Sequence, residues 1–276
     1  MTELARSGTF AQIGDWCAGR ASYRIFSNEW HGVDLLEVAR DAGISPTEVA
    51  NQHFYEHLYR QWKARSFKGD PGWVAAKAKL AQFYRDHLTA LTAPDASLLS
   101  VGAGLGLIEE QLLTFGFRVD LQECQSESLD PARFPQSRIW VSSDLRPITS
   151  GPYDALLALS VVYVFDDTEY ARFATECRRL LRPGGVLIIS DHDPCWPLSR
   201  VKQFANRVRG GPRQLLWGWL RSPKAHATIV QAQGFRLCSQ RFLNHDQDEI
   251  AAPFRMCGLQ MPRGSSVAQV LTFRAV

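Results

Sequence analysis

The sequence predicts an α/β protein with a seven-stranded, mostly parallel sheet and flanking helices, preceded by a helical N-terminal region. From residue 97 onward, short apolar runs alternate with helical stretches, a pattern typical of parallel strands joined by crossover helices. A glycine-rich turn separates the first apolar run from the first of these helices. Residues 1–95 show helical patterns and no convincing strand. We therefore expect a helical cap over 1–95 and a sheet domain over 96–276.

The individual elements follow from the spacing of apolar residues and from the turn residues between them. The expected strands cover 97–101, 117–123, 138–142, 154–160, 185–190, 235–242 and 267–274. Helices are expected near 105–115, 167–181 and 213–233, and in the cap over 33–42, 46–66 and 72–93. Ser45 and Pro46 followed by Glu48 are typical of a helix start.

Composition and charge exclude several classes of protein. Hydrophobic residues at 45% and charged residues at 21% of 276 are ordinary for a globular chain with a large core. The six cysteines are scattered without a CxxC pair, which argues against a disulfide framework or a structural zinc site. The first ten residues lack the order of a signal peptide, and no apolar run approaches a membrane span. We expect a cytoplasmic protein without a metal.

The glycine turn is the sharpest functional feature. Gly102, Gly104 and Gly106 follow the strand 97–101 and open the next helix. Glycine lets the backbone turn tightly and approach a ligand closely, and the free N–H groups at a helix start suit a polar or anionic group. The next strand ends at Glu123, where a carboxylate is placed to accept both hydroxyls of a ribose. A dinucleotide turn would need glycine at Leu107, and a chance glycine cluster is the remaining alternative.

In these residues the chain resembles the class I S-adenosylmethionine-dependent methyltransferase family, whose first motif is acid-x-G-x-G-x-G with an acid closing the second strand. WVSSDL at 140–145 resembles the family's third-strand segment, and YDALLALSVVYVFDD at 153–167 its fourth strand and following loop. ECRRLLRPGGVLIISD at 176–191 resembles the next helix, turn and strand, and HATIVQAQGFRLCSQRFL at 226–243 the last helix and sixth strand. The resemblance implies a Rossmann-like sheet and S-adenosyl-L-methionine as the cofactor.

The resemblance also implies a cofactor site made of the glycine turn, the ends of the next strands and two tyrosines of the cap. In FYEHLYRQW at 54–62 the tyrosines lie on one helix face, where they close over the cofactor or simply pack in a core. Asp144 stands where the family's acid contacts adenine. Ser100 stands where the family usually has an acid, so a hydrogen bond replaces charge attraction there. The expected cofactor contacts are Tyr55, Tyr59, Ser100, Gly102, Ala103, Gly104, Gly106, Glu123, Cys124, Asp144, Leu145, Leu159 and Ser160.

Methyl transfer from a sulfonium requires the acceptor atom in line with the methyl group and, for a hydroxyl, a group that takes its proton. Some relatives place a catalytic His just after the fourth strand, where this chain has Tyr163. His192, just past the fifth strand, is therefore the candidate base, with Tyr163 as the second catalytic candidate. The alternatives are a loop histidine bonded to its flanking carboxylates, or a metal site of Asp191, His192 and Asp193.

A basic, aromatic segment covers residues 196–225. Between Asp193 and Asp246 the chain has no Asp or Glu but nine Lys and Arg residues, which suggests an anionic partner. The segment follows the fifth strand, where the family places substrate-specific insertions, so we expect the acceptor to contact Arg207, Arg209, Arg213 and Trp217. A solvated basic face, a membrane-surface contact and nucleic-acid binding are the other interpretations.

The sequence thus predicts O-methylation of an anionic small molecule or glycan precursor. An N-methyltransferase is the first alternative. A non-catalytic cofactor binder or a DNA-binding regulator is the second, because residues 35–54 resemble a helix-turn-helix. That segment has no basic residue at 46–54, so no DNA partner is expected.

Overall fold

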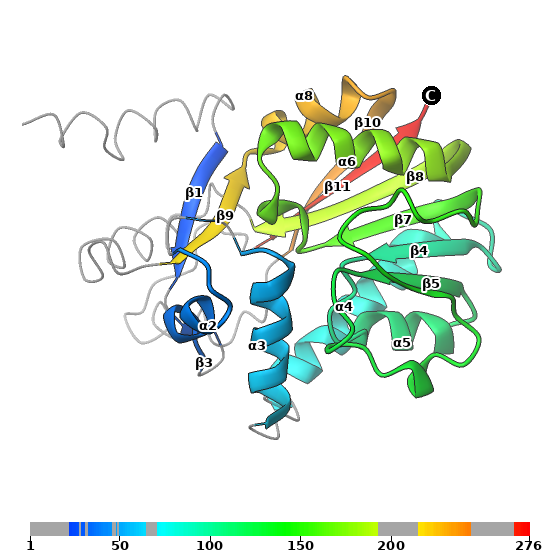
Figure 1. Cartoon of the computed structure of the whole chain (residues 1–276). Helices are drawn as coiled ribbons and strands as arrows, with labels where there is room; N and C mark the ends of the chain where they lie inside the picture. The colour runs from blue at the N-terminus through cyan, green and yellow to red at the C-terminus, as the bar shows by residue number, and fades with distance from the viewer. Residues whose placement is uncertain are drawn as a thin grey trace, which may run out of the picture.

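Seven strands form one sheet in the order β10-β11-β8-β7-β4-β5-β6 (Figure 1). The computed structural model describes residues 22–27, 29–30, 33–45, 48, 50–64, 71–192, 215–243 and 268–276. The strands are β4 (Ser97–Val101), β5 (Arg118–Glu123), β6 (Ile139–Val141), β7 (Tyr153–Leu159), β8 (Leu181–His192), β10 (Phe235–Leu243) and β11 (Ala268–Ala275). All seven predicted strands are confirmed.

Strand direction fixes where a ligand can bind. The pairs β4–β5, β4–β7, β5–β6 and β7–β8 are parallel, and β11 is antiparallel to both β8 and β10. The strand order reverses at β4, which lies between β5 and β7. In open α/β sheets the crevice beyond the carboxyl ends of the strands at such a point is the ligand site.

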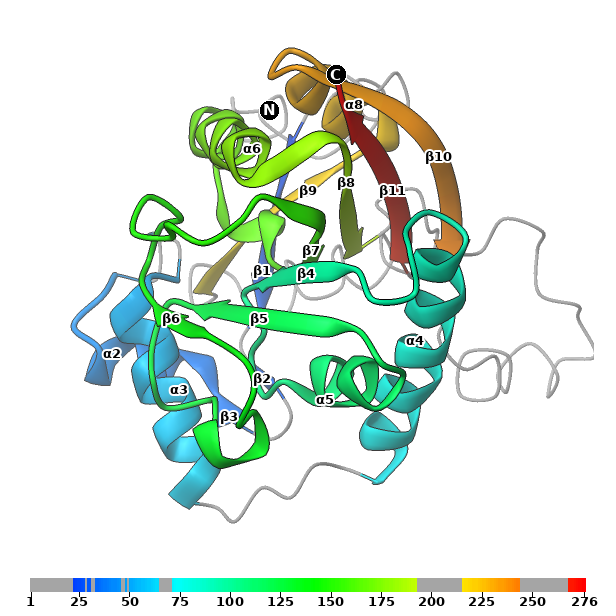
Figure 2. The ribbon, with the colours of Figure 1, turned by 90° about the vertical axis from the view of Figure 1, so that its right-hand side faces the viewer.

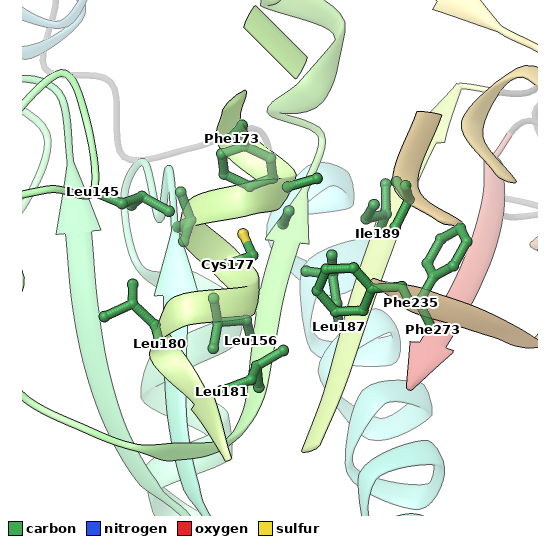
Figure 3. Close-up of a cluster of buried hydrophobic side chains, with 14 of the residues drawn as sticks. Leu145, Leu156, Phe173, Cys177, Leu180, Leu181, Leu187, Ile189, Phe235 and Phe273 are labelled. Atoms are coloured by element: carbon green, nitrogen blue, oxygen red, sulfur yellow. The ribbon is translucent and has the colours of Figure 1, made fainter. Parts of the chain in front are cut away.

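Helices cover both faces of the sheet (Figure 2). One face packs against α4 (Pro71–Thr89) and α5 (Leu107–Thr114), through a buried cluster that includes Tyr84, Leu112 and Ile188. The other packs against α6 (Asp167–Leu180) and α8 (Pro223–Gln231). Figure 3 shows Leu187 and Ile189 of β8 within this second cluster. Strand residues alternate between the two faces, which is why the parallel strands read as continuous apolar runs.

The N-terminal region is not purely helical, so that part of the prediction is wrong. It contains α2 (Leu35–Asp41) and α3 (Gln52–Ala64), but also β1 (Ser22–Ser27), β2 (Glu29–Trp30) and β3 (Val33–Asp34). The helix expected from Pro46 begins at Gln52, because Asn51 Oδ1 accepts the Phe54 N–H as a cap. Ser45 and Glu48 form a separate turn before it, in which Ser45 N–H donates to Glu48 Oε2 at 2.7 Å.

The helix expected over 213–233 is also wrong, because a strand occupies its first half. β9 (Leu215–Arg221) pairs antiparallel with β1, and α8 begins only at Pro223. Ser222 Oγ accepts the Ala225 N–H as the cap of α8, and Gly218 has a φ of +152°, which a helix does not allow. Arg207, Arg209 and Arg213 lie outside the described residues, as does the side chain of Trp217. Within the described residues no helix is long and apolar enough to cross a membrane.

Candidate active site

A cavity of about 950 Å³ lies at the carboxyl ends of β4 to β7. Its floor comes from the segments that follow these strands, including Gly102, Glu123 and Ser160. Tyr55 and Tyr59 of α3 line it from the N-terminal region. The volume is at the upper end of the range for small-molecule pockets, so there is room for a cofactor and an acceptor together.

The glycine turn borders this cavity in a conformation that favours glycine. Gly102, Gly104 and Gly106 have φ values of +64°, +59° and +67°, the left-handed region that costs residues with a Cβ. A Cβ on Gly102 would lie 2.4 Å from the Val161 side chain, and one on Gly106 would lie 2.4 Å from the Phe134 ring. A Cβ on Gly104 would instead meet the Tyr59 hydroxyl at 3.1 Å. The turn is therefore held close to the segment that follows β7 on one side and to α3 on the other.

Glu123 ends β5 with a buried carboxylate in the cavity wall. Its Oε2 accepts the Gly104 N–H and its Oε1 accepts the Cys124 N–H, both at 2.7 Å. Burial raises the pKa of Glu123, and these hydrogen bonds oppose the rise. A carboxylate oxygen has two lone pairs, so each oxygen keeps the capacity to accept a further hydroxyl. The arrangement fits the two hydroxyls of a ribose.

Gln122 is a cavity residue that the sequence interpretation missed. Its side-chain Oε1 accepts the Gly102 N–H at 3.1 Å, and its Nε2 donates to the Ser142 carbonyl oxygen. The side chain thereby joins the glycine turn to the segment after β6. Its position directly before Glu123, at the end of a strand, was the available signal.

Three tyrosines meet where α3 approaches η3 (Val162–Val164), the short helix after β7. The hydroxyl oxygens of Tyr55 and Tyr163 are 3.3 Å apart. Burial raises the pKa values of Tyr55 and Tyr59 well above the ordinary value, so both phenols are neutral at physiological pH. They act there as hydrogen-bond donors and acceptors rather than as bases.

Ser160 directly follows β7 and carries backbone strain at the cavity. It is the one non-glycine residue in the described part of the chain with a positive φ, +56°, and its N–H donates to the Ser190 carbonyl oxygen at 2.7 Å. Such conformations persist when the surrounding structure fixes them, and they concentrate at functional sites. Here the turn directs the following residues, Val161 to Phe165, along the cavity.

The segment after β6 supplies the cavity's other predicted contacts. Asp144 and Leu145 both line the cavity. Asp144 pairs with Arg146 at 2.6 Å, and that hydrogen bond lowers the pKa of Asp144. Cys124 also lines the cavity, and burial raises the pKa of its thiol, so it is uncharged at neutral pH.

Five predicted cofactor contacts lie outside the cavity lining in the described structure: Ser100, Ala103, Gly104, Gly106 and Leu159. Ser100 is buried, and its Oγ donates to Glu109 Oε1 of α5 at 2.7 Å. The Leu159 side chain packs on the α4–α5 face, and Ala103 packs against a small buried cluster. Gly106 faces Phe134. The N–H groups of Ala103, Gly104 and Gly106 all donate within the fold, to the Gln122 carbonyl oxygen, the Glu123 carboxylate and the Ala103 carbonyl oxygen.

The end of β8 places Asp191 away from the cavity. Its carboxylate is 1% exposed and lies 3.9 Å from Nε2 of the fully buried His226. His192 is the last residue of β8, and its side chain lies outside the described residues. The burial of Asp191 removes it as a ligand in the predicted metal alternative.

Comparison with known proteins agrees with this geometry. Residues 99–189 match the family model of a methyltransferase domain. Two curated relatives, both named ubiquinone biosynthesis O-methyltransferase, come from Caulobacter vibrioides and Cereibacter sphaeroides. The first is 28% identical over 120 residues, covering 40% of this chain and 46% of that protein. The second is 29% identical over 191 residues, covering 63% and 72%. The chain thus spans about half the length of the Caulobacter relative.

Solved structures share the fold. A magnesium protoporphyrin IX methyltransferase from Synechocystis PCC 6803 with bound S-adenosylhomocysteine has a TM-score of 0.57 at 15% identity, covering 79% of this chain and 94% of that one. A 1,6-didemethyltoxoflavin-N1-methyltransferase from Burkholderia thailandensis also has a TM-score of 0.57 at 15% identity, covering 92% and 96%. The sheet order, the glycine turn and the match over residues 99–189 show that the chain contains a methyltransferase domain with the fold of the class I S-adenosylmethionine-dependent enzymes.

Proposed function

We propose that this protein transfers the methyl group of S-adenosylmethionine to a hydroxyl oxygen of a small molecule. The observation that carries the proposal is one cavity that contains both a ribose-type carboxylate, Glu123, and the paired hydroxyls of Tyr55 and Tyr163. The names of the curated relatives, ubiquinone biosynthesis O-methyltransferase, support oxygen as the accepting atom.

The cofactor end of the cavity is the part next to β5 and β6. There Glu123 would accept the ribose hydroxyls, backbone groups of the turn at 102–106 would face the chain of the cofactor, and Asp144 with Leu145 would border the adenine. The bound cofactor supplies an activated methyl group on a sulfonium. Glu123 also accepts the Gly104 N–H, so the same side chain would both hold the glycine turn in place and bind the ribose.

The acceptor end is the part next to α3 and η3. An acceptor hydroxyl beside the Tyr55–Tyr163 pair would exchange hydrogen bonds with these phenols, which would orient its lone pair toward the methyl group. We propose His192 as the group that removes the hydroxyl proton, because it ends β8, the strand beside β7. We propose further that Arg207, Arg209, Arg213 and Trp217 contact an anionic part of the acceptor, as their sequence position suggests.

The test incubates the full chain with S-adenosylmethionine and a panel of hydroxyl and amine acceptors, and detects methylated product and S-adenosylhomocysteine by mass spectrometry. Product from hydroxyl acceptors is expected. Product from amines alone would identify an N-methyltransferase. Binding of S-adenosylhomocysteine without any product across the panel would favour the non-catalytic alternative.

A matched pair of tyrosine variants tests the acceptor end. Tyr163→Phe should lower kcat by roughly tenfold while the affinity for S-adenosylhomocysteine stays unchanged, because one orienting hydrogen bond is lost. Tyr153→Phe is the control, since Tyr153 begins β7 away from the cavity lining and its hydroxyl donates to Asp120 of β5. Equal kcat values for the two variants would remove Tyr163 from the acceptor end.

A further inference from the structure

Arg221, the last residue of β9, carries a fully buried guanidinium in the described structure. Its Nη2 donates to the Phe165 carbonyl oxygen at 2.6 Å and its Nη1 to the Val162 carbonyl oxygen at 3.3 Å. Its Nε donates to Asp167 Oδ1 at 2.8 Å. The guanidinium carbon also lies 5.0 Å from the centre of the Tyr170 ring. All of these partners belong to one short stretch, residues 162–170.

These partners enclose Tyr163. Val162 precedes it, Phe165 follows it by two residues, and Asp167 begins α6 directly afterwards. The guanidinium therefore fixes both ends of the segment that presents the Tyr163 hydroxyl to the cavity. Its five N–H donors form a rigid fork, which sets the spacing between two carbonyl groups in a way that a flexible ammonium does not.

β9 contacts the same segment at a second point. Gly218 lies against Tyr163 so closely that a Cβ there would be 2.2 Å from the Tyr163 carbonyl oxygen. The next residue, Trp219, lines the cavity. β9 itself is paired with β1 beside α2 and α3 (Figure 1). The strand β9 thus supplies Trp219 to the cavity wall, Gly218 to a close contact with Tyr163, and Arg221 to the hydrogen bonds on both sides of Tyr163.

The burial of the Arg221 charge argues that its hydrogen bonds to residues 162–167 have a role beyond stability. Removing a cation from water costs several kcal/mol unless every donor is satisfied, and the Asp167 side chain that pairs with Arg221 is itself 62% exposed. An apolar side chain of similar volume would fill the same space with less desolvation. What it would not do is hold the Val162 and Phe165 carbonyl groups at a fixed distance.

We propose that Arg221 is a positioning residue for methyl transfer, which sets the place of the Tyr163 hydroxyl at the acceptor end of the cavity. The inference rests on the proposed function, because it assigns Tyr163 to the acceptor. Arg221 is one of the nine basic residues counted between Asp193 and Asp246, but its guanidinium is used within the fold.

The experiment is a double-mutant cycle on the full chain. Arg221→Lys keeps the charge but loses the fork, and should lower kcat by about 10–100-fold, the scale of a small misplacement of a reacting group. The dissociation constant for S-adenosylhomocysteine should stay within about twofold. In a Tyr163→Phe background the same substitution should lower kcat by less than about threefold, because the group that it positions is gone. Arg178→Lys is the control; Arg178 donates two bonds to the Val276 carbonyl oxygen, away from the cavity.

Asp167→Asn provides a milder second variant at an exposed side chain. It removes the ion pair alone, and its effect on kcat should have the same sign and vanish in the Tyr163→Phe background. Additive losses in either cycle would show that Arg221 acts independently of Tyr163 and would overturn the inference.

Hydrogen exchange with S-adenosylhomocysteine bound separates this inference from the proposed function. Peptides that cover residues 160–166 should exchange faster in Arg221→Lys than in the wild type or in Arg178→Lys. If no hydroxyl compound is methylated, the proposed function fails while the exchange result still decides whether Arg221 holds this segment. Equal exchange in all three proteins would overturn the inference even if the wild type is active.

Discussion

Replacing Glu123 with glutamine should weaken cofactor binding without unfolding the protein. The substitution conserves size but removes the negative charge and converts one acceptor oxygen into a donor. In the structure both carboxylate oxygens already face backbone N–H groups, those of Gly104 and Cys124. The new NH₂ group would therefore oppose one of these donors, and the glutamine would lose at least one charge-assisted bond to the ribose.

The size of the effect follows from that count. A hydrogen bond to a charged group contributes about 1.5–3 kcal/mol, so loss of one bond corresponds to roughly 10–150-fold weaker binding of S-adenosylhomocysteine. Burial raises the pKa of Glu123, and the ionised form accepts the ribose bonds. Wild-type affinity should therefore fall as the pH drops through this raised pKa. The affinity of the Glu123→Gln variant should not show this decrease with falling pH.

Isothermal titration calorimetry across a pH series measures both quantities. Glu109→Gln is the matched control, because Glu109 is equally buried but its carboxylate accepts a bond from Ser100 on the α4–α5 side of the sheet. A folded Glu123→Gln variant that binds within twofold of the wild type would refute the assignment of this carboxylate to the ribose.

Four further expectations concern other parts of the structure. Gly104→Asp should abolish S-adenosylhomocysteine binding in calorimetry, because it forces a side chain against the Tyr59 hydroxyl and a second acid toward Glu123; retained binding would contradict the turn's role. His192→Ala should lower kcat by about 10²–10⁴-fold, and the wild-type rate should rise with pH as the base loses its proton. A pH-independent rate would exclude this base. Replacing Arg207, Arg209 and Arg213 by Gln should raise the acceptor's KM in steady-state assays, and added salt should do the same to the wild type, whereas unchanged KM values would favour a neutral acceptor. Burial, together with the nearby Arg221 charge, lowers the pKa of His226 to about 3, so between about pH 6.5 and that value only the unfolded chain takes up a proton on this histidine. The free energy of unfolding from urea titrations should therefore be about 2 kcal/mol lower at pH 5 than at pH 6.5. The decrease should be smaller in His226→Gln.

The sheet could be predicted from the sequence because its signals are local. A strand buried on both faces is an apolar run, and the glycine turn and Glu123 mark where two such runs end. The cavity floor follows from the strand order once the parallel sheet is recognised. The same local logic correctly gives α6, whose capping box joins Asp166 and Glu169.

The wall that β9 contributes to the cavity could not be predicted, because its contacts join segments that are distant in the sequence. β9 resembles half of an amphipathic helix, and only its pairing with β1 makes it a strand. Gly218 and the Ser222–Pro223 step were the local signs that a helix does not run through this segment. Similarly, the basic segment appears free of acidic partners in the sequence, yet Arg221 pairs with Asp167 of α6. A charge count along the chain does not detect such a pairing.

The pairing of β1 with β9 has a consequence for the order in which the protein folds. Ser27 and Leu215 are about 190 residues apart, whereas β4 and β5 pair across a short crossover; closing the longer loop costs about 2 kcal/mol more in chain entropy. Contacts between distant segments also form late. The glycine turn and the cavity floor can therefore be complete while the wall with Trp219 is still open, so that during refolding cofactor affinity returns before selection of the acceptor.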